Sequence, residues 1–166
     1  MINLINKEPR IPIIAVRRLV GKKITMSSSG DKTHELWKSF MTGKNKIKNN
    51  ISSELYSMKF YGPGFFDDFN PDRNFEKIAA IQVSDFNYVP DGMENFILPS
   101  GLYAVFQYKG KASEASYTFK YIYYEWLPDS GYVLDDRPHF EILGEKYKND
   151  DENSEEEIWI PVKREN

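Results

Sequence analysis

The sequence contains no cysteine, only two histidines and no long apolar run. Without cysteine, the chain can form no disulfide bond, no thiolate nucleophile and no cysteine-ligated zinc site. No stretch of about 18 apolar residues occurs, so no membrane-spanning helix is predicted. The N-terminal stretch Met1–Arg10 also lacks the apolar core of a signal peptide. These absences together predict a cytoplasmic protein without a membrane partner.

Runs of basic residues are also missing. The 25 aspartates and glutamates outnumber the 22 lysines and arginines, and the formal charge is −3. Because nucleic-acid-binding surfaces need clustered positive charge, we expect no direct nucleic-acid binding. His34 and His139 are far apart, and no set of His, Asp and Glu has the spacing of metal ligands, so neither a metal nor a cofactor is expected. The acidic stretch Glu145–Glu157 lacks the glycine of a calcium-binding loop and is predicted to be a solvated hairpin loop.

The apolar pattern predicts a single α+β domain over residues 1–166, a length that suits one domain. One helix is expected around Leu36–Met41, and a second over Phe119–Trp126 that ends at Pro128. Gly21 is expected to end the first strand, and Lys44–Ser53 to be a polar connector. Strands are expected at Arg10–Val20, Tyr56–Phe60, Phe75–Val83, Leu102–Tyr108, His139–Leu143 and Glu156–Val162.

An internal repeat is predicted from three coincidences of spacing. Gly21-Lys22 and Gly110-Lys111 each precede a tryptophan by sixteen residues, from 21 to 37 and from 110 to 126. Each half then has Phe-Glu in its next apolar strand, at Phe75-Glu76 and Phe140-Glu141. The order predicts two βαββ halves, at about 10–83 and 100–163, joined by a connector at 84–99. Each half is too small to bury its own sheet face, so the two would pack around a shared core or cleft.

Glu141 is the first candidate for a functional residue, because it lies between Phe140 and Ile142 in a short apolar strand. In a regular strand it shares a face with His139 and Leu143. That face either meets water, or it holds a partly buried carboxylate that takes up a proton or pairs with a cation. Its repeat mate Glu76 fits an edge or surface position better than a second pocket acid.

Aromatic residues make up 15% of the chain and suit a lined cavity as well as a core. Tryptophans on apolar helix faces are usually core residues, but near a cavity they stack on flat or cationic ligands. Tyr61, which precedes Gly62-Pro63-Gly64, is the best loop candidate because ligand sites favour such turns. The same two interpretations apply to Trp37, Trp126, Tyr56, Tyr103, Tyr108 and Tyr123.

Taken in order, these motifs resemble the GyrI-like small-molecule-binding family, which also supplies the effector domain of multidrug-responsive transcription activators. The resemblance covers Arg10–Val162 and is looser in the first half. The matching stretches are Leu98–Phe106, Lys109-Gly110, Trp126–Tyr132, Pro138–Glu141 and Ile158–Val162.

The resemblance implies a duplicated βαββ fold with pseudo-twofold symmetry and a ligand cleft between the halves. In drug-responsive members a buried glutamate among aromatic residues receives flat, cationic, lipophilic compounds, and the Phe-Glu motif places that role on Glu141. Some stand-alone relatives are hydrolases that open cyclopropane-type genotoxins with the same glutamate, and others have been described as gyrase inhibitors. No helix-turn-helix is expected before Arg10.

The leading hypothesis is therefore a stand-alone module that binds amphipathic, cationic or planar aromatic compounds. The alternatives are a hydrolase with Glu141 as the catalytic residue, and a module that binds a protein such as gyrase through the acidic hairpin. The predicted ligand contacts are Glu141, Trp126, Tyr103, Tyr61, Trp37, Tyr108, Tyr123 and Leu143.

Overall fold

The computed structural model describes residues 2–166, which divide into two compact units. Unit 1 contains the N-terminal segment up to Ala15, Ser100–Asp135 and Glu141–Asn166. Unit 2 contains Val16–Pro99 and Asp136–Phe140. The fold class is α+β, as predicted, since each unit packs helical turns on antiparallel strands. Within residues 2–166, no helix is both long enough and apolar enough to cross a membrane.

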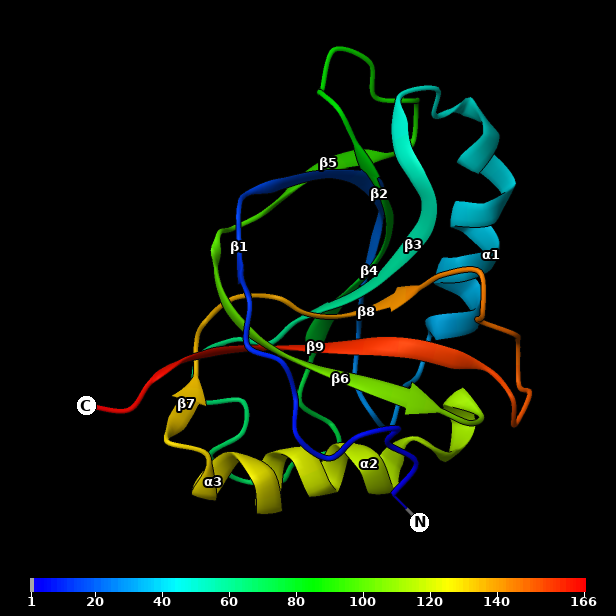
Figure 1. The fold of residues 1–166 in the computed structure, drawn as a ribbon. Helices are drawn as coiled ribbons and strands as arrows, with labels where there is room; N and C mark the ends of the chain where they lie inside the picture. Colours follow the sequence, from blue (N-terminus) through cyan, green and yellow to red (C-terminus); the bar gives the residue numbers. More distant parts are fainter. Residues whose placement is uncertain (1) are drawn as a thin grey trace. The chain divides into compact units, whose positions relative to one another are not determined.

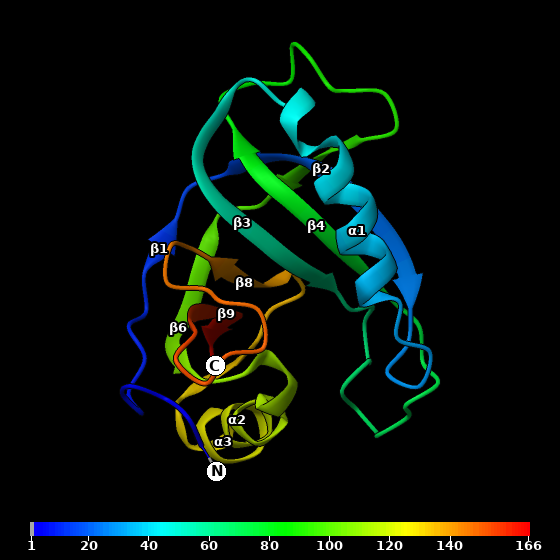
Figure 2. The same ribbon diagram turned by 90° about the vertical axis from the view of Figure 1, so that its right-hand side faces the viewer.

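Unit 2 is an antiparallel sheet with one long helix on it. Its strands lie in the order β3-β4-β2-β5, and the helix α1 (Thr33–Gly43) contacts β2 and β4 (Figures 1 and 2). Leu36 and Phe40 are four positions apart on α1 and are both buried against this sheet. The strands are β2 (Arg17–Met26), β3 (Asn50–Phe60), β4 (Phe75–Val83) and β5 (Glu94–Leu98), and the 3-10 turn η1 (Lys44–Lys46) follows α1.

The prediction that Gly21 ends the first strand is wrong. The strand β2 continues through Gly21 to Met26, and Gly21 pairs with Ala80 on β4. A β-carbon at Gly21 would lie 2.6 Å from the Cα atom of Ala80, so this position needs glycine because two backbones approach closely. The predicted connector Lys44–Ser53 is also too long, because β3 already begins at Asn50.

In unit 1 the strands lie in the order β1-β6-β9-β8, and β7 pairs with the end of β9. β6 and β9 pair over seven positions, and apolar residues such as Ala104 and Ile160 lie opposite each other. Strand β8 straddles the division, since its first two residues, His139 and Phe140, cluster with unit 2. The strands are β1 (Ile13–Ile14), β6 (Gly101–Lys109), β7 (Tyr132–Leu134), β8 (His139–Leu143) and β9 (Glu155–Arg164).

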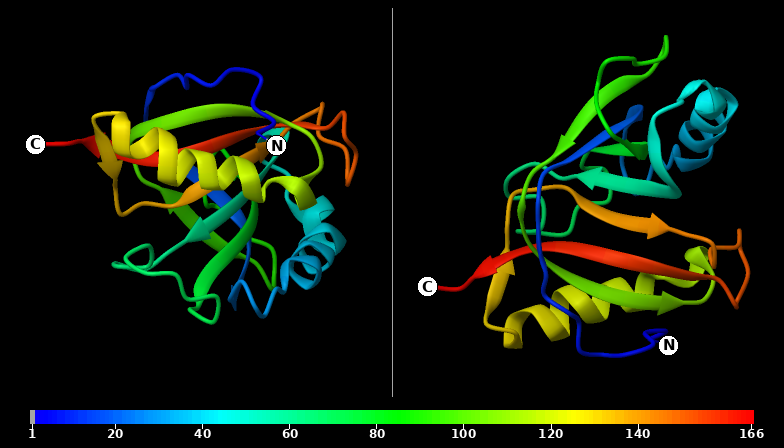
Figure 3. Two further views of the ribbon diagram at one scale, coloured as in Figure 1. Left: turned by 90° about the horizontal axis from the view of Figure 1, so that it is seen from below. Right: turned by 45° about the horizontal axis from the view of Figure 1, so that its top comes forward.

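A continuous helical segment covers β6 and β9 in unit 1 (Figure 3). It consists of η2 (Ala112–Glu114), α2 (Ser116–Tyr121), the π-helical turn η3 (Ile122–Trp126) and α3 (Leu127–Asp129). The segment ends at Asp129, within the stop that the sequence predicts at Pro128 and the turn at 129–131. Pro128 has no backbone N–H to donate to the preceding helical turn, and the helical segment ends one residue after it.

Two short strands were not predicted, β5 in the expected connector and β7 after the helix. In chain order, unit 2 contains β2, α1, η1, β3, β4 and β5. Unit 1 contains β1, β6, the helical segment, β7, the larger part of β8, and β9. Whether the two units descend from a duplication stays a prediction.

Candidate functional site

Glu141 is a buried carboxylate in the middle of β8. Its exposed fraction is 8%, and its neighbours Phe140 and Ile142 are buried as well. Successive side chains of a strand point to opposite faces, so both faces of β8 are covered at this point. Of the two interpretations of Glu141, the structure therefore supports the buried carboxylate and not the face that meets water.

Tyr147, after the end of β8, lies within electrostatic reach of Glu141. Burial raises the pKa of the Tyr147 phenol above its ordinary value, and the charges of Glu156, Asp150 and Glu141 raise it further, in that order. The phenol consequently stays protonated at neutral pH and keeps its O–H as a donor. Glu156, on β9, is also buried. This part of unit 1 thus combines buried negative charge with a neutral phenol.

The predicted aromatic contacts of unit 1 are mostly packed into the structure. Tyr103 is fully buried, with its ring centroid 5.9 Å from that of Trp159. Tyr108 is fully buried too, and its hydroxyl donates a 2.6 Å hydrogen bond to the carbonyl oxygen of Lys111. Tyr123 is half-buried on the helical segment and stacks on Phe119. Leu143, at the end of β8, is also half-buried.

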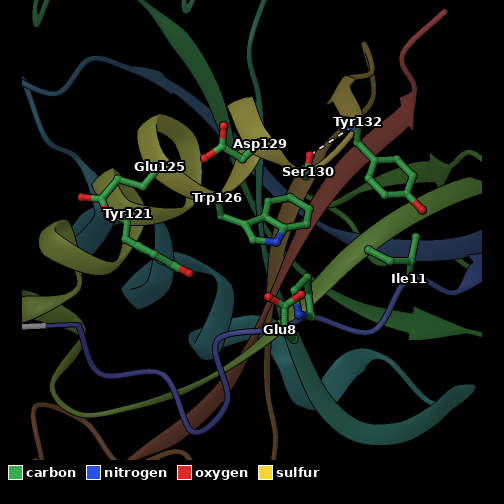
Figure 4. A pocket seen from close by; sticks show the side chains of 9 residues that line it. Glu8, Ile11, Tyr121, Glu125, Trp126, Asp129, Ser130 and Tyr132 are labelled. Carbon is green, nitrogen blue, oxygen red and sulfur yellow. Dashed lines mark hydrogen bonds between the residues drawn. The ribbon is translucent and has the colours of Figure 1, made fainter.

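Trp126 lines a pocket of about 500 Å³ in unit 1 (Figure 4). Its ring meets Phe106 edge-on at 5.2 Å and stacks with Tyr132. The indole of Trp126 thus contacts Phe106 of the core and Tyr132, and it also lines the pocket. Glu141 does not line this pocket, so the structure does not bring Trp126 and Glu141 together there. The lining residues are Glu8, Pro9, Ile11, Tyr121, Glu125, Trp126, Asp129, Ser130 and Tyr132.

The two predicted contacts of unit 2 lie in separate places. Tyr61 is part of an aromatic cluster in which its ring centroid is 4.5 Å from that of Phe65, 5.1 Å from Phe75 and 5.0 Å from His139. Burial lowers the pKa of His139 from 6.5 to about 3, and the charges of Lys59 and Arg137 act in the same direction. Trp37 is half-buried on α1 and meets Phe40 edge-on.

Metal-binding residues do not gather in the part of the chain that the structure describes. Over residues 2–166, no three His, Asp or Glu side chains lie close enough together to hold a metal ion.

A family model of the GyrI-like small molecule binding domain matches residues 7–163. The chain belongs to this family. The match includes both units, so the α+β sheet of each and the carboxylate of Glu141 are parts of a GyrI-like domain. Small-molecule binding is the activity that the family description carries.

Relatives of this GyrI-like domain include a regulator and structures of similar fold. The transcriptional regulator BrlR of Pseudomonas aeruginosa is 28% identical over 145 residues, which are 87% of this chain and 51% of the regulator. The chain thus spans about half the length of that relative. The structure of SAV2435 bound to tetraphenylphosphonium has a TM-score of 0.69 at 18% identity and covers 94% of each chain. A Listeria innocua hydrolase has a TM-score of 0.60 at 14% identity, over 95% of this chain and 92% of that one.

Most residues that line the pocket of this GyrI-like domain were missed by the sequence analysis. Glu8 and Pro9 come from the N-terminal segment, which is far from the helix in sequence. The helical contributors did carry a signal, because Tyr121, Glu125 and Asp129 recur every four positions. That spacing places one tyrosine and two carboxylates on one side of a helix. The apolar stripe beside it is the stronger pattern and predicted the helix without predicting the pocket.

Proposed function

We propose that this GyrI-like domain binds amphipathic organic cations, planar aromatic ones included, and that Glu141 is their anionic partner. The observation that carries the proposal is the burial of a carboxylate, with an exposed fraction of 8%, in the central part of an apolar strand. Removing a carboxylate from water costs several kcal/mol, and a desolvated cation brought next to it recovers part of that cost. Small inorganic cations are strongly hydrated and lose that hydration when they bind. A lipophilic cation is weakly hydrated, so it leaves water for the buried carboxylate more easily.

The ligand class is supported by what a protein of the same fold binds. SAV2435 was determined with tetraphenylphosphonium, a cation whose charge is enclosed by phenyl rings and which has no hydrogen-bond donor. Such a cation can be recognised only by charge and by contact with apolar or aromatic surface. Here Glu141 supplies the charge. Tyr103, in the same unit, is its predicted aromatic partner, whereas Trp126 lines a pocket that does not include Glu141.

The test compares two ions of the same shape and opposite charge. Titration calorimetry with tetraphenylphosphonium and tetraphenylborate should show binding of the cation and much weaker binding of the anion. Glu141→Gln keeps the size of the side chain and removes its charge, so it should weaken cation binding at least tenfold, which corresponds to about 1.4 kcal/mol. Glu76→Gln, at the half-exposed Glu76 of β4, is the matched control and should bind like the wild type.

The proposal fails if both ions bind equally well to the wild type, or if Glu141→Gln and Glu76→Gln have the same affinity. A cation affinity that falls equally in both variants would point to general attraction by the acidic surface. In that case Glu141 would have no special part.

A hydrolase is the second candidate, favoured by the protonated phenol of Tyr147 near Glu141. Glu141 would take a proton from water as the water oxygen bonds to a strained ring carbon. The carbon–carbon bond of the ring would break, and its electron pair would pass to an adjacent carbonyl that then takes up a proton. Glu141→Gln should abolish consumption of a cyclopropyl electrophile while its binding partly survives. Unchanged turnover in that variant excludes the mechanism.

A protein partner such as gyrase is the third candidate, through the acidic stretch 145–157. The prediction of a solvated loop over the whole stretch is wrong, because Glu155–Glu157 belong to β9 and Glu156 is buried. In the loop before β9, the Ser154 hydroxyl accepts a 2.8 Å hydrogen bond from the backbone N–H of Lys148. Shortening the loop without any change in the captured proteins would remove this candidate.

A further inference from the structure

We propose that the pocket around Trp126 in unit 1 is a second ligand site, which takes small organic ammonium ions and works independently of Glu141. We call it the Trp126 pocket, and its lining residues are those given above. Its volume of about 500 Å³ is within the range of small-molecule sites, roughly 300–1,000 Å³. The proposal rests on three features of this pocket: how the chain builds it, the charge on its walls, and the state of its aromatic rings.

The first wall of the Trp126 pocket comes from the N-terminal segment, which is fixed at both ends to β6. The backbone N–H of Ile5 donates to the carbonyl oxygen of Gln107, and that of Val105 donates to the carbonyl oxygen of Arg10, each at 2.9 Å. Between these two contacts the segment carries Glu8 and Pro9 to the pocket. The wall is thus held in place by backbone hydrogen bonds on either side of Glu8.

The second wall comes from the helical segment, where the π-helical turn η3 changes which residues share a side. In an α-helix, with 3.6 residues per turn, positions i and i+5 do not share a face. The hydrogen bonds of a π-helix span five residues, and this wider turn brings i+4 and i+5 to the same side. Tyr121, Glu125 and Trp126 stand in that relation across η3. Asp129 and Ser130 follow Glu125 and Trp126 by four positions, the ordinary spacing of one α-helical turn.

The charge on the walls is entirely negative. Glu8, Glu125 and Asp129 all line the Trp126 pocket, and no lysine or arginine does. Over residues 2–166, none of these three side chains takes part in an ion pair or a hydrogen bond. The three carboxylates are not gathered closely enough to ligate one metal ion. Their arrangement suits a larger cation, one whose charge is spread over an organic group.

The rings of the Trp126 pocket already meet one cation of the protein itself. The guanidinium carbon of Arg164 lies 5.6 Å from the centroid of Tyr132, which in turn stacks with Trp126. Figure 4 shows the Trp126 indole in the middle of the pocket, with Glu8 and Asp129 on different sides of it and Tyr132 beyond. A cation over the face of such a ring is attracted to it, and more strongly when the cation is desolvated.

The test follows the indole N–H signal of Trp126 by NMR while benzyltrimethylammonium is added to the full chain. The signal is identified by its loss in Trp126→Phe. We expect it to shift at millimolar benzyltrimethylammonium and to respond much less to benzyl alcohol, which is neutral. The double variant Glu8→Gln/Asp129→Asn should weaken the binding at least fivefold. The matched control Glu145→Gln/Glu152→Gln removes two exposed charges of the hairpin loop instead and should bind like the wild type.

Two results overturn the proposal, provided that the variants melt like the wild type. One is an equal shift with the neutral alcohol or no shift at all, and the other is an equal loss of affinity in the test and control variants. Glu141→Gln separates this proposal from the function proposed above. If the Trp126 pocket is a second site, Glu141→Gln leaves the benzyltrimethylammonium shift of Trp126 unchanged. If Glu141→Gln instead weakens binding at Trp126 as much as it weakens binding of tetraphenylphosphonium, the two ligands share one site and the proposal is refuted.

Discussion

Trp126 and Tyr132 stack with their ring centroids 6.5 Å apart and their planes inclined by 16°. Trp126 ends the π-helical turn η3, and Tyr132 begins β7, so the stack joins the helical segment to the sheet of unit 1. Arg164 pairs with Tyr132 across β7 and β9 and places its guanidinium over the Tyr132 ring. Of the aromatic rings in the Trp126 pocket, Trp126 thus packs on Phe106 of the core, and Tyr132 contacts the guanidinium of Arg164.

Replacing Arg164 should improve cation binding in the Trp126 pocket. In Arg164→Gln the protein loses the positive charge that lies over Tyr132, so a ligand cation meets less repulsion and a free ring face. We expect the affinity for benzyltrimethylammonium to rise about two- to fivefold, which corresponds to about 0.5–1 kcal/mol. The shift of the Trp126 indole signal measures it.

Lys163→Gln is the matched control for Arg164→Gln. Lys163 carries the same charge one position earlier, pairs with Val133 on β7 and is exposed. It should change the affinity much less. Equal gains in the two variants would mean that only the net charge of the domain matters and that the Tyr132 ring has no part.

Gly21 should be far more sensitive to substitution than its place in a polar-looking turn sequence implies. Its neighbours across the sheet are backbone atoms of Ala79 and Ala80, which cannot move aside as a flexible side chain would. Gly21→Ala forces β2 and β4 apart and should lower the free energy of unfolding by about 3 kcal/mol or more, since overpacking a buried site costs about 1–3 kcal/mol even without backbone contact. Urea unfolding followed by circular dichroism measures the loss.

Gly62→Ala is the control for Gly21→Ala, because a β-carbon there meets nothing within 4 Å. At such a site alanine restricts the unfolded chain and should leave stability unchanged or raise it by up to about 1 kcal/mol. Similar losses at Gly21 and Gly62 would contradict the close approach of β2 and β4.

The sequence was most informative where an apolar run is bounded by breakers. The strands Phe75–Val83 and His139–Leu143 were predicted with the bounds that the structure gives them, and the helix around Leu36–Met41 is the centre of α1. Gly21 was misjudged because glycine in a sequence cannot be seen to face another backbone. Glycine occurs both where a strand ends and where two backbones approach closely, so the residue type alone does not distinguish the two.

The strands β5 and β7 depend on pairing with distant partners, so local pattern could not reveal them. β7 has only three residues and exists because Tyr132–Leu134 meets the end of β9. For the same reason Glu8 could not be associated with Trp126. The N-terminal segment is placed beside the helix by pairing with β6 and by the backbone N–H of Asn3, which donates to the hydroxyl of Thr118 in α2. The burial of Glu141 was one of two arrangements that the sequence left open, because an acid inside an apolar strand can also lie on a face that meets water.

His139 should make the stability of the protein depend on pH in the acidic range. Its ring is buried against Tyr61 and Phe66, and its pKa is lowered from 6.5 to about 3. Between these values the unfolded chain binds a proton at this residue and the folded chain does not, so acid favours unfolding. The stabilisation is complete above about pH 6.5 and is lost progressively as the pH falls toward about 3.

The expected size of the His139 effect is a loss of about 2 kcal/mol in the free energy of unfolding between about pH 7 and about pH 5. His139→Gln removes the titrating group and should flatten the pH dependence by that amount. His34→Gln, at the exposed histidine of α1, should keep the wild-type slope. Urea unfolding of the three proteins at both pH values decides the matter, because carboxylates contribute equally to all three and cancel in the comparison. If His139→Gln keeps the full slope, the histidine is not held neutral in the folded protein.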